Sequence, residues 1–324
     1  MTDQTHDQAA ILQHVGNTPL LSLRAVAPDL PPTVALYGKA EWMNPGGSVK
    51  DRAALGMIRD GERRGVLSPG MHIADATSGN TGIAYATLGA ALGYGVTVAM
   101  PDNASPERIQ TLKILGAEVL LTPADAGMDR AMDTIQQLVR DQPDRYFYPD
   151  QYNNPANAQA HEDTTAPEIW RQTAGQVTHF VAGMGTCGTF TGTGRGLRRE
   201  HSSIQLIGVQ PTSGDHGIEG IKHLATTTRI PGIYDPQLAD GTIAVETDAA
   251  YAMARQLART TGWLVGISAA ANVAAAVTVA RQLTHGTVVT ILCDSAARYL
   301  SASFWQDAEA DTDTSMNGRK TYGA

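Results

Sequence analysis

The chain has 324 residues, and its hydrophobic content of 42% is enough to build the cores of two domains of ordinary size. A formal net charge of −8, without any run of basic residues, argues against a nucleic-acid partner. Two cysteines, Cys187 and Cys293, are too few for a disulfide scaffold or a Cys-rich zinc site, and the nine histidines show no HExxH motif, so we expect no metal.

The N-terminus and the cysteine usage bear on location. Residues 1–7 are polar and acidic, without the basic and apolar regions of a signal peptide, and no apolar run reaches membrane-spanning length. Two cysteines in a chain of this size suit a reducing compartment. We therefore expect a cytoplasmic protein that does not cross a membrane.

The first half of the chain alternates short apolar runs with helical patterns. Gly65, Gly93 and Gly116 are typical of helix ends, and Pro106 suits a first helical turn. Strands are expected over 34–37, 72–76, 96–100, 119–122 and 146–148, and helices over 48–65, 81–92, 105–116 and 128–140. This alternation predicts a parallel sheet covered by helices.

A loop rich in Asn and Pro, residues 151–157, interrupts this rhythm and indicates a domain junction. Strands are expected beyond it over 179–182, 204–209, 263–265 and 288–292, and helices up to 199 and over 248–260 and 268–283, with a less regular segment over 213–240. We expect two doubly wound, three-layer α/β domains. The smaller would span 43–153, the larger 10–42 and 154–305, and an acidic tail over 306–324 would be disordered.

The segment 44–52, NPGGSVKDR, predicts a loop that leads into a helix. Ser48, with Asp51 three residues on, is typical of an N-cap with an acidic partner. Lys50 would then be the second helical residue, where the helix dipole disfavours an ammonium and lowers its pKa. Lysines that form Schiff bases need this shift. A surface lysine beside a turn fits these nine residues equally well.

The segment 77–82, TSGNTG, follows an expected strand and opens a helix. Its glycines allow close backbone approach, and its hydroxyls with the helix N-terminal amides suit an anion such as a carboxylate. Simple capping by Thr77 or Ser78 is the alternative. Four polar side chains in six residues exceed what a cap requires.

The segment 183–189, GMGTCGT, lies between a strand and a helix and formally matches the GxGxxG fingerprint of dinucleotide-binding oxidoreductases. Such a fold also needs an acidic residue at the end of the next strand, which here ends at Val209-Gln210-Pro211. An NAD-dependent oxidoreductase is therefore disfavoured. A single phosphate monoester, bound by backbone N–H groups and threonine hydroxyls, is the better ligand.

A third loop places the hydroxyl of Ser268 at a helix start after a strand, which in isolation an N-cap explains better. The combination of loops says more. A lysine amine, a phosphate cradle and a carboxylate pocket together indicate pyridoxal phosphate acting on an amino acid.

These motifs resemble the cysteine synthase and cystathionine β-synthase family of fold-type II pyridoxal-phosphate enzymes. The resemblance covers Gly16–Leu20, Asn44–Arg52, Thr77–Gly82, Gln151 with Asn154–Asn157, Gly185–Thr189, Gly266–Ser268 and Arg298–Ser301. It implies a fold like that of the tryptophan synthase β subunit, with the cofactor in the cleft between two domains, and a homodimer.

The resemblance also implies a role for each matching position. Lys50 would form the Schiff base with the cofactor, and Asn80 would hydrogen-bond its 3′ oxygen. Ser268 would face the pyridine nitrogen, where a neutral partner favours β-elimination over transamination. The phosphate would be held by Gly185, Thr186, Cys187, Gly188 and Thr189, and the substrate carboxylate by Thr77, Ser78, Thr81 and Gln151.

The implied reaction is β-replacement on an O-activated L-serine, either O-acetylserine or O-phosphoserine, by a sulfur nucleophile. Lys50 would remove the α-proton, and L-cysteine or S-sulfocysteine would form via an aminoacrylate. A cystathionine β-synthase-like enzyme, or another β-substituted alanine synthase, is the alternative. The sequence leaves open the leaving group and the sulfur donor.

Two positions carry finer expectations. Cys187 stands where the family more often has Gly or Thr, and a small filler explains it better than a redox role. The stretches 220–223 and 293–294 look more like cysteine synthase B than the A type, a branch that tolerates anionic donors such as thiosulfate. Lys222 would help to bind such a donor, although an ordinary exposed lysine fits as well.

Overall fold

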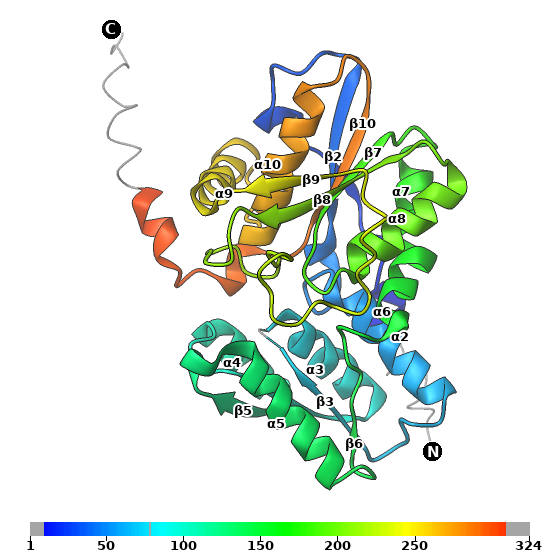
Figure 1. Cartoon of the computed structure of the whole chain (residues 1–324), viewed down its shortest axis with the longest axis vertical. Coiled ribbons are helices and arrows are strands. Elements are labelled where there is room, and N and C mark those ends of the chain that lie inside the picture. Colours follow the sequence, from blue (N-terminus) through cyan, green and yellow to red (C-terminus); the bar gives the residue numbers. More distant parts are fainter. Residues whose placement is uncertain (1–9, 78, 309–324) are drawn as a thin grey trace, which may run out of the picture.

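The computed structural model describes residues 10–77 and 79–308, whose strands form two separate sheets (Figure 1). The strands of the larger sheet are β1 (Leu20–Ser22), β2 (Val34–Ala40), β7 (His179–Gly183), β8 (Gln205–Pro211), β9 (Gly241–Val245) and β10 (Gly286–Leu292). Those of the smaller sheet are β3 (His72–Ala76), β4 (Gly95–Pro101), β5 (Glu118–Thr122) and β6 (Tyr146–Phe147).

Helices cover both faces of each sheet, as the alternating sequence pattern predicted. They are α2 (Lys50–Arg63), α3 (Asn80–Leu92), α4 (Pro106–Ile114), α5 (Gly127–Asp141), α6 (Pro155–Ala160), α7 (Ala166–Gln172), α8 (Gly188–Glu200), α9 (Thr247–Thr261) and α10 (Ile267–Arg281). The predicted doubly wound α/β fold is confirmed.

The larger sheet has the strand order β1-β2-β10-β7-β8-β9, and only the edge pair β1–β2 is antiparallel. Helices α9 and α10 lie on one face, and α7 and α8 lie on the other (Figure 1). The Ala-rich helix α10 is buried along most of its length, which lets its backbone approach the sheet closely. This places Ser268, in its first turn, beside the carboxyl end of β10.

The smaller sheet is fully parallel in the order β5-β4-β3-β6. Helix α3 is apolar around its whole circumference and packs with α2 over one face, while the amphipathic α5 covers the other. The carboxyl end of β3 therefore delivers the loop beginning at Thr77 towards the larger sheet. The strands of the two sheets come from the residue ranges expected for the two domains, and that domain division itself remains a prediction.

The expected N-cap at Ser48 is wrong. Helix α2 begins at Lys50, and the carboxylate of Asp51 turns back to accept a hydrogen bond from the Gly46 amide at 2.5 Å. Before the helix, Ser48 forms an antiparallel bridge with Asp294, and the Val49 amide donates to the Cys293 carbonyl. The pairing with the end of β10 therefore holds Ser48 outside the helix; Val49, with φ −58° and ψ −20°, is the N-cap, and Lys50 is the first helical residue.

Other differences are local. The expected strand over 263–265 reduces to a single bridge between Val265 and Ser295, because only a short linker separates α9 from α10. No helix was expected between 158 and 178, where α6, a π-helical turn over His161–Thr165 and α7 follow one another. Asn154 caps α6 and Pro155 is its first residue, a start signal that the sequence contained.

A short 3-10 helix, Ser303–Ala308, ends the described chain; the rest of the tail expected to be disordered lies outside the described residues. Among the described helices, none is long and apolar enough to cross a membrane.

Candidate active site

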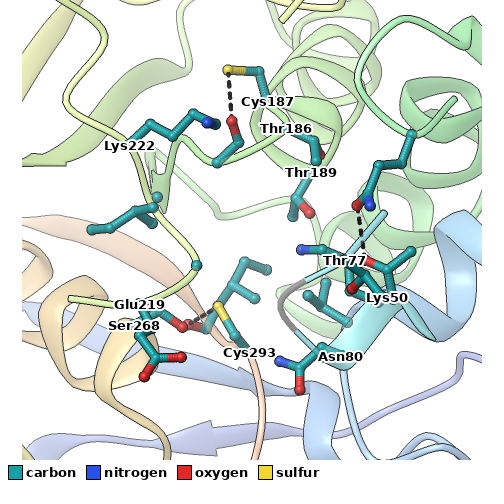
Figure 2. A pocket seen from close by; sticks show the side chains of 18 of the residues that line it. Lys50, Thr77, Asn80, Thr186, Cys187, Thr189, Glu219, Lys222, Ser268 and Cys293 are labelled. Carbon is teal, nitrogen blue, oxygen red and sulfur yellow. Dashed lines mark hydrogen bonds between the residues drawn. The ribbon is translucent and has the colours of Figure 1, made fainter. Parts of the chain in front are cut away.

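Lys50 lines a cavity of about 290 Å³ that is bordered by loops at the carboxyl ends of strands from both sheets (Figure 2). Within the described part of the chain, its Nζ has no hydrogen bond or ion pair. Burial lowers the pKa of Lys50, and the nearby Cys293 and Asp294 oppose this shift. The result is an amine biased towards its neutral, nucleophilic form.

Thr77 lies at the start of the loop that faces Lys50. Its Oγ1 accepts hydrogen bonds from the amides of Gly79 (3.0 Å) and Gly82 (3.3 Å), which leaves its own O–H free to donate. The Thr81 hydroxyl donates to Oε1 of Gln151 at 2.8 Å, and Gln151 Nε2 donates to a backbone carbonyl. Thr77 and the second N–H of Gln151 therefore remain as donors for an anion.

The loop that begins α8 forms a second anion site. The amides of Gly185, Thr186 and Cys187 donate no hydrogen bond within the described chain, and Cys187 adopts a left-handed conformation with φ +67°. A Cβ at Gly185 would lie 2.2 Å from the Gly220 carbonyl oxygen, so only glycine fits there. Unpaired amides at a helix N-terminus, with two threonine hydroxyls, suit a phosphate group.

Two buried side chains that the sequence analysis did not single out support this loop. Asn157 Nδ2 donates to Oγ1 of Thr186 at 3.2 Å, and Nε2 of His161 lies 3.2 Å from Oγ1 of Thr189. Burial lowers the pKa of His161 to about 3, and the Arg52 charge adds to the effect, so the imidazole is neutral at pH 7. The motif NPAN contained Asn157, but no local pattern marked His161.

Ser268 lies on the opposite wall, where a hydrogen bond joins it to the Cys293 thiol (Figure 2). Burial raises the pKa of Cys293 to about 11 and that of Cys187 to about 12, so both are neutral thiols near pH 7. Asn272 donates to Sγ of Cys293 at 3.4 Å. Its buried Oδ1 has no partner in the described chain.

Asn80, the first residue of α3, contacts two residues that follow β10. Its Nδ2 donates to Asp294 Oδ2 at 2.7 Å, and its Oδ1 accepts a hydrogen bond from Arg298. Tyr299, which lines the cavity, donates to the same Asp294 oxygen at 2.7 Å. Asn80 therefore retains one N–H for an acceptor in the cavity.

The segment over 212–240 forms the mouth of the cavity. The Lys222 amide donates to the Met184 carbonyl, which holds this segment beside the loop that begins α8. The Lys222 ammonium lies 5.2 Å from the centroid of the Tyr152 ring, and burial lowers its pKa while Asp129 opposes the shift. Nearby, Glu219 pairs with Arg108 of α4 at 2.5 Å.

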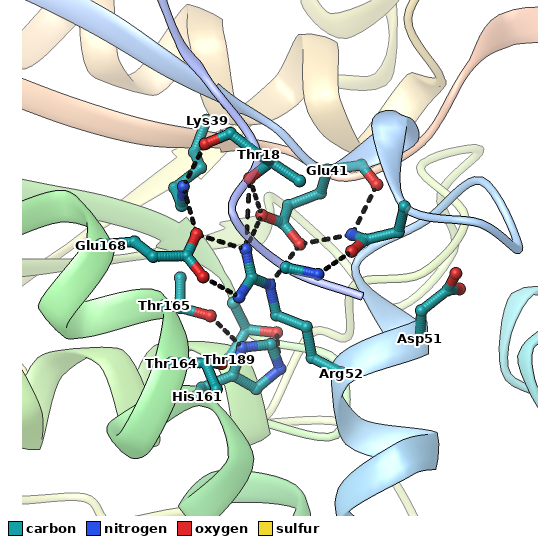
Figure 3. Close-up of polar contacts among 12 residues, drawn as sticks. Thr18, Lys39, Glu41, Asp51, Arg52, His161, Thr164, Thr165, Glu168 and Thr189 are labelled. Carbon is teal, nitrogen blue, oxygen red and sulfur yellow. Dashed lines mark hydrogen bonds and ion pairs between the residues drawn. The ribbon is translucent and has the colours of Figure 1, made fainter. Parts of the chain in front are cut away.

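A buried ion cluster surrounds Arg52, which lies two residues after Lys50 in the sequence (Figure 3). Arg52 of α2 donates to Glu41 and, through Nη1 and Nη2, to Glu168 of α7. Lys39 Nζ lies 2.7 Å from Glu168, so two cations balance two carboxylates. The Thr18 hydroxyl donates to Glu41 at 2.7 Å, which ties the N-terminal segment to the same cluster.

The predicted site residues mostly meet at one cavity. Those that line it are Lys50, Thr77, Asn80, Thr81, Gln151, Gly185, Thr186, Cys187, Thr189 and Ser268. Gly188 begins α8 directly behind the loop, and Ser78 lies outside the described residues. Among the described residues, no group of His, Cys, Asp or Glu side chains has the arrangement of a metal site.

These groups fit pyridoxal phosphate. The unpaired amine would meet the aldehyde of the cofactor. The free amides and the threonine hydroxyls would meet its phosphate, close to a glycine whose position leaves no room for a Cβ. The geometry thus defines a class of protein, the pyridoxal-phosphate-binding α/β enzymes. The sequence model of the family described as pyridoxal-phosphate dependent enzymes matches residues 11–294, and the chain belongs to that family.

The curated relatives are more specific. The chain is 47% identical over 304 residues to "Cysteine synthase" of Aquifex aeolicus, covering 92% of this chain and 93% of that one. It is 43% identical over 289 residues to "Cysteine synthase B" of Salmonella typhimurium, covering 89% and 93%. The family resemblance and the dependence on pyridoxal phosphate that the motifs predicted are confirmed.

Solved structures agree. A cysteine synthase from Entamoeba histolytica superposes with a TM-score of 0.86 at 34% identity, covering 97% of this chain and 92% of that one. An O-acetylserine-dependent cystathionine β-synthase from Helicobacter pylori has a TM-score of 0.85, also at 34% identity, covering 91% and 98%. The fold is thus shared by enzymes that are named for different products.

Proposed function

We infer that the chain is a cysteine synthase, which replaces the acetyl ester of O-acetyl-L-serine with sulfur to give L-cysteine. Relatives named cysteine synthase at 47% and 43% identity support this reaction, as does the arrangement of the cavity. The observation that supports this proposal most directly is that the unpaired Lys50 amine, the Thr77 loop and the loop that begins α8 all line one cavity. These are the groups that an amino-acid β-replacement requires.

Pyridoxal phosphate supplies the electron sink for negative charge at Cα of the substrate. We propose that Lys50 carries the cofactor and then acts as the base that removes the α-proton. Its lowered pKa supports both roles, because each requires the neutral amine. A proton returned to Cα from the same amine would complete the product after sulfur has added at Cβ.

The other site residues bind and orient. We propose that the phosphate is held by the free amides of Gly185, Thr186 and Cys187, and that the Asn80 N–H meets the 3′ oxygen. On the substrate side, Thr77 and Gln151 would bind the carboxylate with their remaining donors. Ser268 would face the ring nitrogen as a neutral partner.

The reaction is tested directly with purified holoenzyme, O-acetylserine and sulfide. We expect cysteine and acetate in equal amounts, with ping-pong kinetics. O-acetylserine alone should change the absorbance of the bound cofactor before any sulfide is added. The absence of both a spectral change and product with O-acetylserine and with O-phosphoserine would contradict the proposed reaction.

We further propose that Lys222 lets the enzyme use an anionic sulfur donor such as thiosulfate, which would give S-sulfocysteine. Lys222 lines the cavity mouth, and within the described chain its ammonium has no carboxylate within ion-pair distance. A partly desolvated cation attracts a dianion more strongly than a neutral or singly charged donor.

The ratio of thiosulfate to sulfide activity tests this role. Lys222→Ala should lower kcat/KM for thiosulfate about tenfold and leave that for sulfide nearly unchanged. Lys113→Ala, which removes an exposed lysine on α4, is the matched control. An unchanged ratio in Lys222→Ala would leave Lys222 without a role in donor choice.

We also propose a cytoplasmic homodimer. Three large apolar side chains, Met43, Leu264 and Leu300, are 58%, 54% and 61% exposed, and their segments join through the Ala296–Leu264 backbone hydrogen bond and the Arg298–Gly46 contact. Exposed apolar groups of this kind support an interface.

Both cysteines are free thiols, which suits a reducing compartment such as the cytoplasm. Light scattering should give twice the chain mass of 34.2 kDa.

A further inference from the structure

Arg298 connects two parts of the site that come from different elements. It lies in the short turn Ala296–Arg298 after β10, and its guanidinium donates to Asn80 Oδ1 and to the Gly46 carbonyl. Asn80 opens α3 beside the smaller sheet, and Gly46 lies in the loop before Lys50. The Arg298 side chain, which follows the last strand of the larger sheet, therefore contacts both the start of α3 and the loop before Lys50.

The Arg298 contact fixes the orientation of the Asn80 amide. A guanidinium has only N–H donors, so the amide oxygen and not the amide nitrogen must face it. The nitrogen then points the other way, with one N–H donated to Asp294 at 2.7 Å. Since Asn80 lines the cavity, its second N–H is held as a donor to whatever acceptor enters there.

The same guanidinium also fixes the backbone position of the loop that leads into Lys50. The Gly46 amide donates to Asp51 at 2.5 Å and the Gly46 carbonyl accepts from Arg298, so the peptide units on both sides of Gly46 are held. Gly47 has φ +79°, and a Cβ there would lie 2.9 Å from Arg298 Nη2. The Ser105 hydroxyl donates to the Arg298 carbonyl at 3.0 Å, which anchors the turn to the start of α4.

We propose that Arg298 is a positioning residue for the cofactor: it presents the Asn80 N–H to the 3′ oxygen of pyridoxal phosphate and fixes the Lys50 loop relative to it. This inference rests on the proposed roles of Asn80 and Lys50. Arg298 itself is not among the residues that line the cavity, so it would act through Asn80 and Gly46.

A double-mutant cycle on cofactor affinity tests the proposal. The Kd of pyridoxal phosphate is measured by equilibrium dialysis of purified holoenzyme for the wild type, Arg298→Gln, Asn80→Ala and the double variant. We expect Arg298→Gln to raise Kd about tenfold, as for a lost charged hydrogen bond, and to add little once Asn80 is alanine. The pH midpoint of the bound cofactor's absorbance should move in the same direction in both single variants.

Arg298→Lys keeps the charge but loses the two-pronged contact, and it should also raise Kd. Arg281→Gln, at an exposed ion pair, is the control and should leave Kd unchanged. An unchanged Kd in both Arg298 variants would overturn the inference. An equal loss of cofactor affinity from Arg298→Gln in the wild type and in Asn80→Ala would also overturn it. If Arg298→Gln does not fold, the same cycle is run with Arg298→Lys. A wild type that binds no pyridoxal phosphate would instead contradict the proposed function itself.

Discussion

Arg52 and Glu168 form a two-pronged buried ion pair, with Nη1–Oε1 and Nη2–Oε2 distances of 2.7 and 2.8 Å. The pair joins α2, which begins with Lys50, to α7 beside the larger sheet. The same carboxylate accepts from the Asn17 amide at 2.9 Å. The helix that begins with Lys50 is thus fixed to the rest of the protein by a cluster whose charged side chains do not line the cavity.

Glu168→Gln removes one charge from this cluster and leaves Arg52 and Lys39 with a single carboxylate, Glu41. We expect the free energy of unfolding to fall by about 3–5 kcal/mol, the usual cost of an uncompensated buried charge. Urea unfolding measures the change. Asp29→Asn, which breaks an exposed pair with Arg281, should not shift the midpoint. Similar midpoints for the two variants would contradict the structural role of the cluster.

His161 predicts a pH dependence of stability. Its folded-state pKa of about 3 lies below that of an unfolded histidine, so on acidification the unfolded chain takes up this proton first. Stability is then lost as the pH falls from about 6.5 towards the folded pKa. His161→Gln should remove about 2 kcal/mol of the loss between pH 7 and pH 5. Equal pH dependence in wild type and variant would show that the pKa of His161 is the same in the folded and unfolded chain.

Gly185→Ala tests the phosphate cradle. The added Cβ would lie 2.2 Å from the Gly220 carbonyl oxygen, so the loop must move away from the mouth segment. We expect the Kd of pyridoxal phosphate to rise at least about tenfold as amide contacts to the phosphate are lost. Gly241→Ala, whose Cβ would meet only Ile207 at 3.5 Å, is the matched control. An unaltered Kd in Gly185→Ala would place the phosphate elsewhere.

Thr77→Val separates substrate binding from cofactor binding. Valine keeps the shape but loses the acceptor for two amides and the donor that faces the cavity. KM for O-acetylserine should rise about tenfold with the Kd of pyridoxal phosphate unchanged, and Thr77→Ser should restore most of the loss. If Thr77→Val impaired cofactor binding and left KM unaffected, the assignment of this loop to the carboxylate would be wrong.

Much of the fold followed from the sequence because parallel strands and their covering helices leave strong local patterns. Gly93 and Gly116 mark helix ends, and the alternation of short apolar runs with helices predicted the two-layered cover of each sheet. The start of α2 was misplaced because it depends on the pairing of Ser48 with Asp294, a contact across 246 residues. Local capping rules contain no information about such a contact.

The site shows the same division. Loops that follow strands were predictable, since their motifs are contiguous, and the predicted residues that the structure describes gather at one cavity. His161, Asp294 and Cys293 were missed as site components because each acts through a partner far along the chain, such as Thr189 for His161. The role of Arg298 likewise becomes visible only where the turn after β10 meets α3.

The central claim is that Lys50 carries pyridoxal phosphate. Borohydride reduction of the holoenzyme fixes the cofactor to the amine that holds it, and peptide mass spectrometry then identifies that residue. We predict the pyridoxyl mass on the peptide containing Lys50, and its loss in Lys50→Ala together with turnover. The same label on Lys39, Lys113 or Lys222 in the wild type, or β-replacement activity retained in Lys50→Ala, would contradict the account.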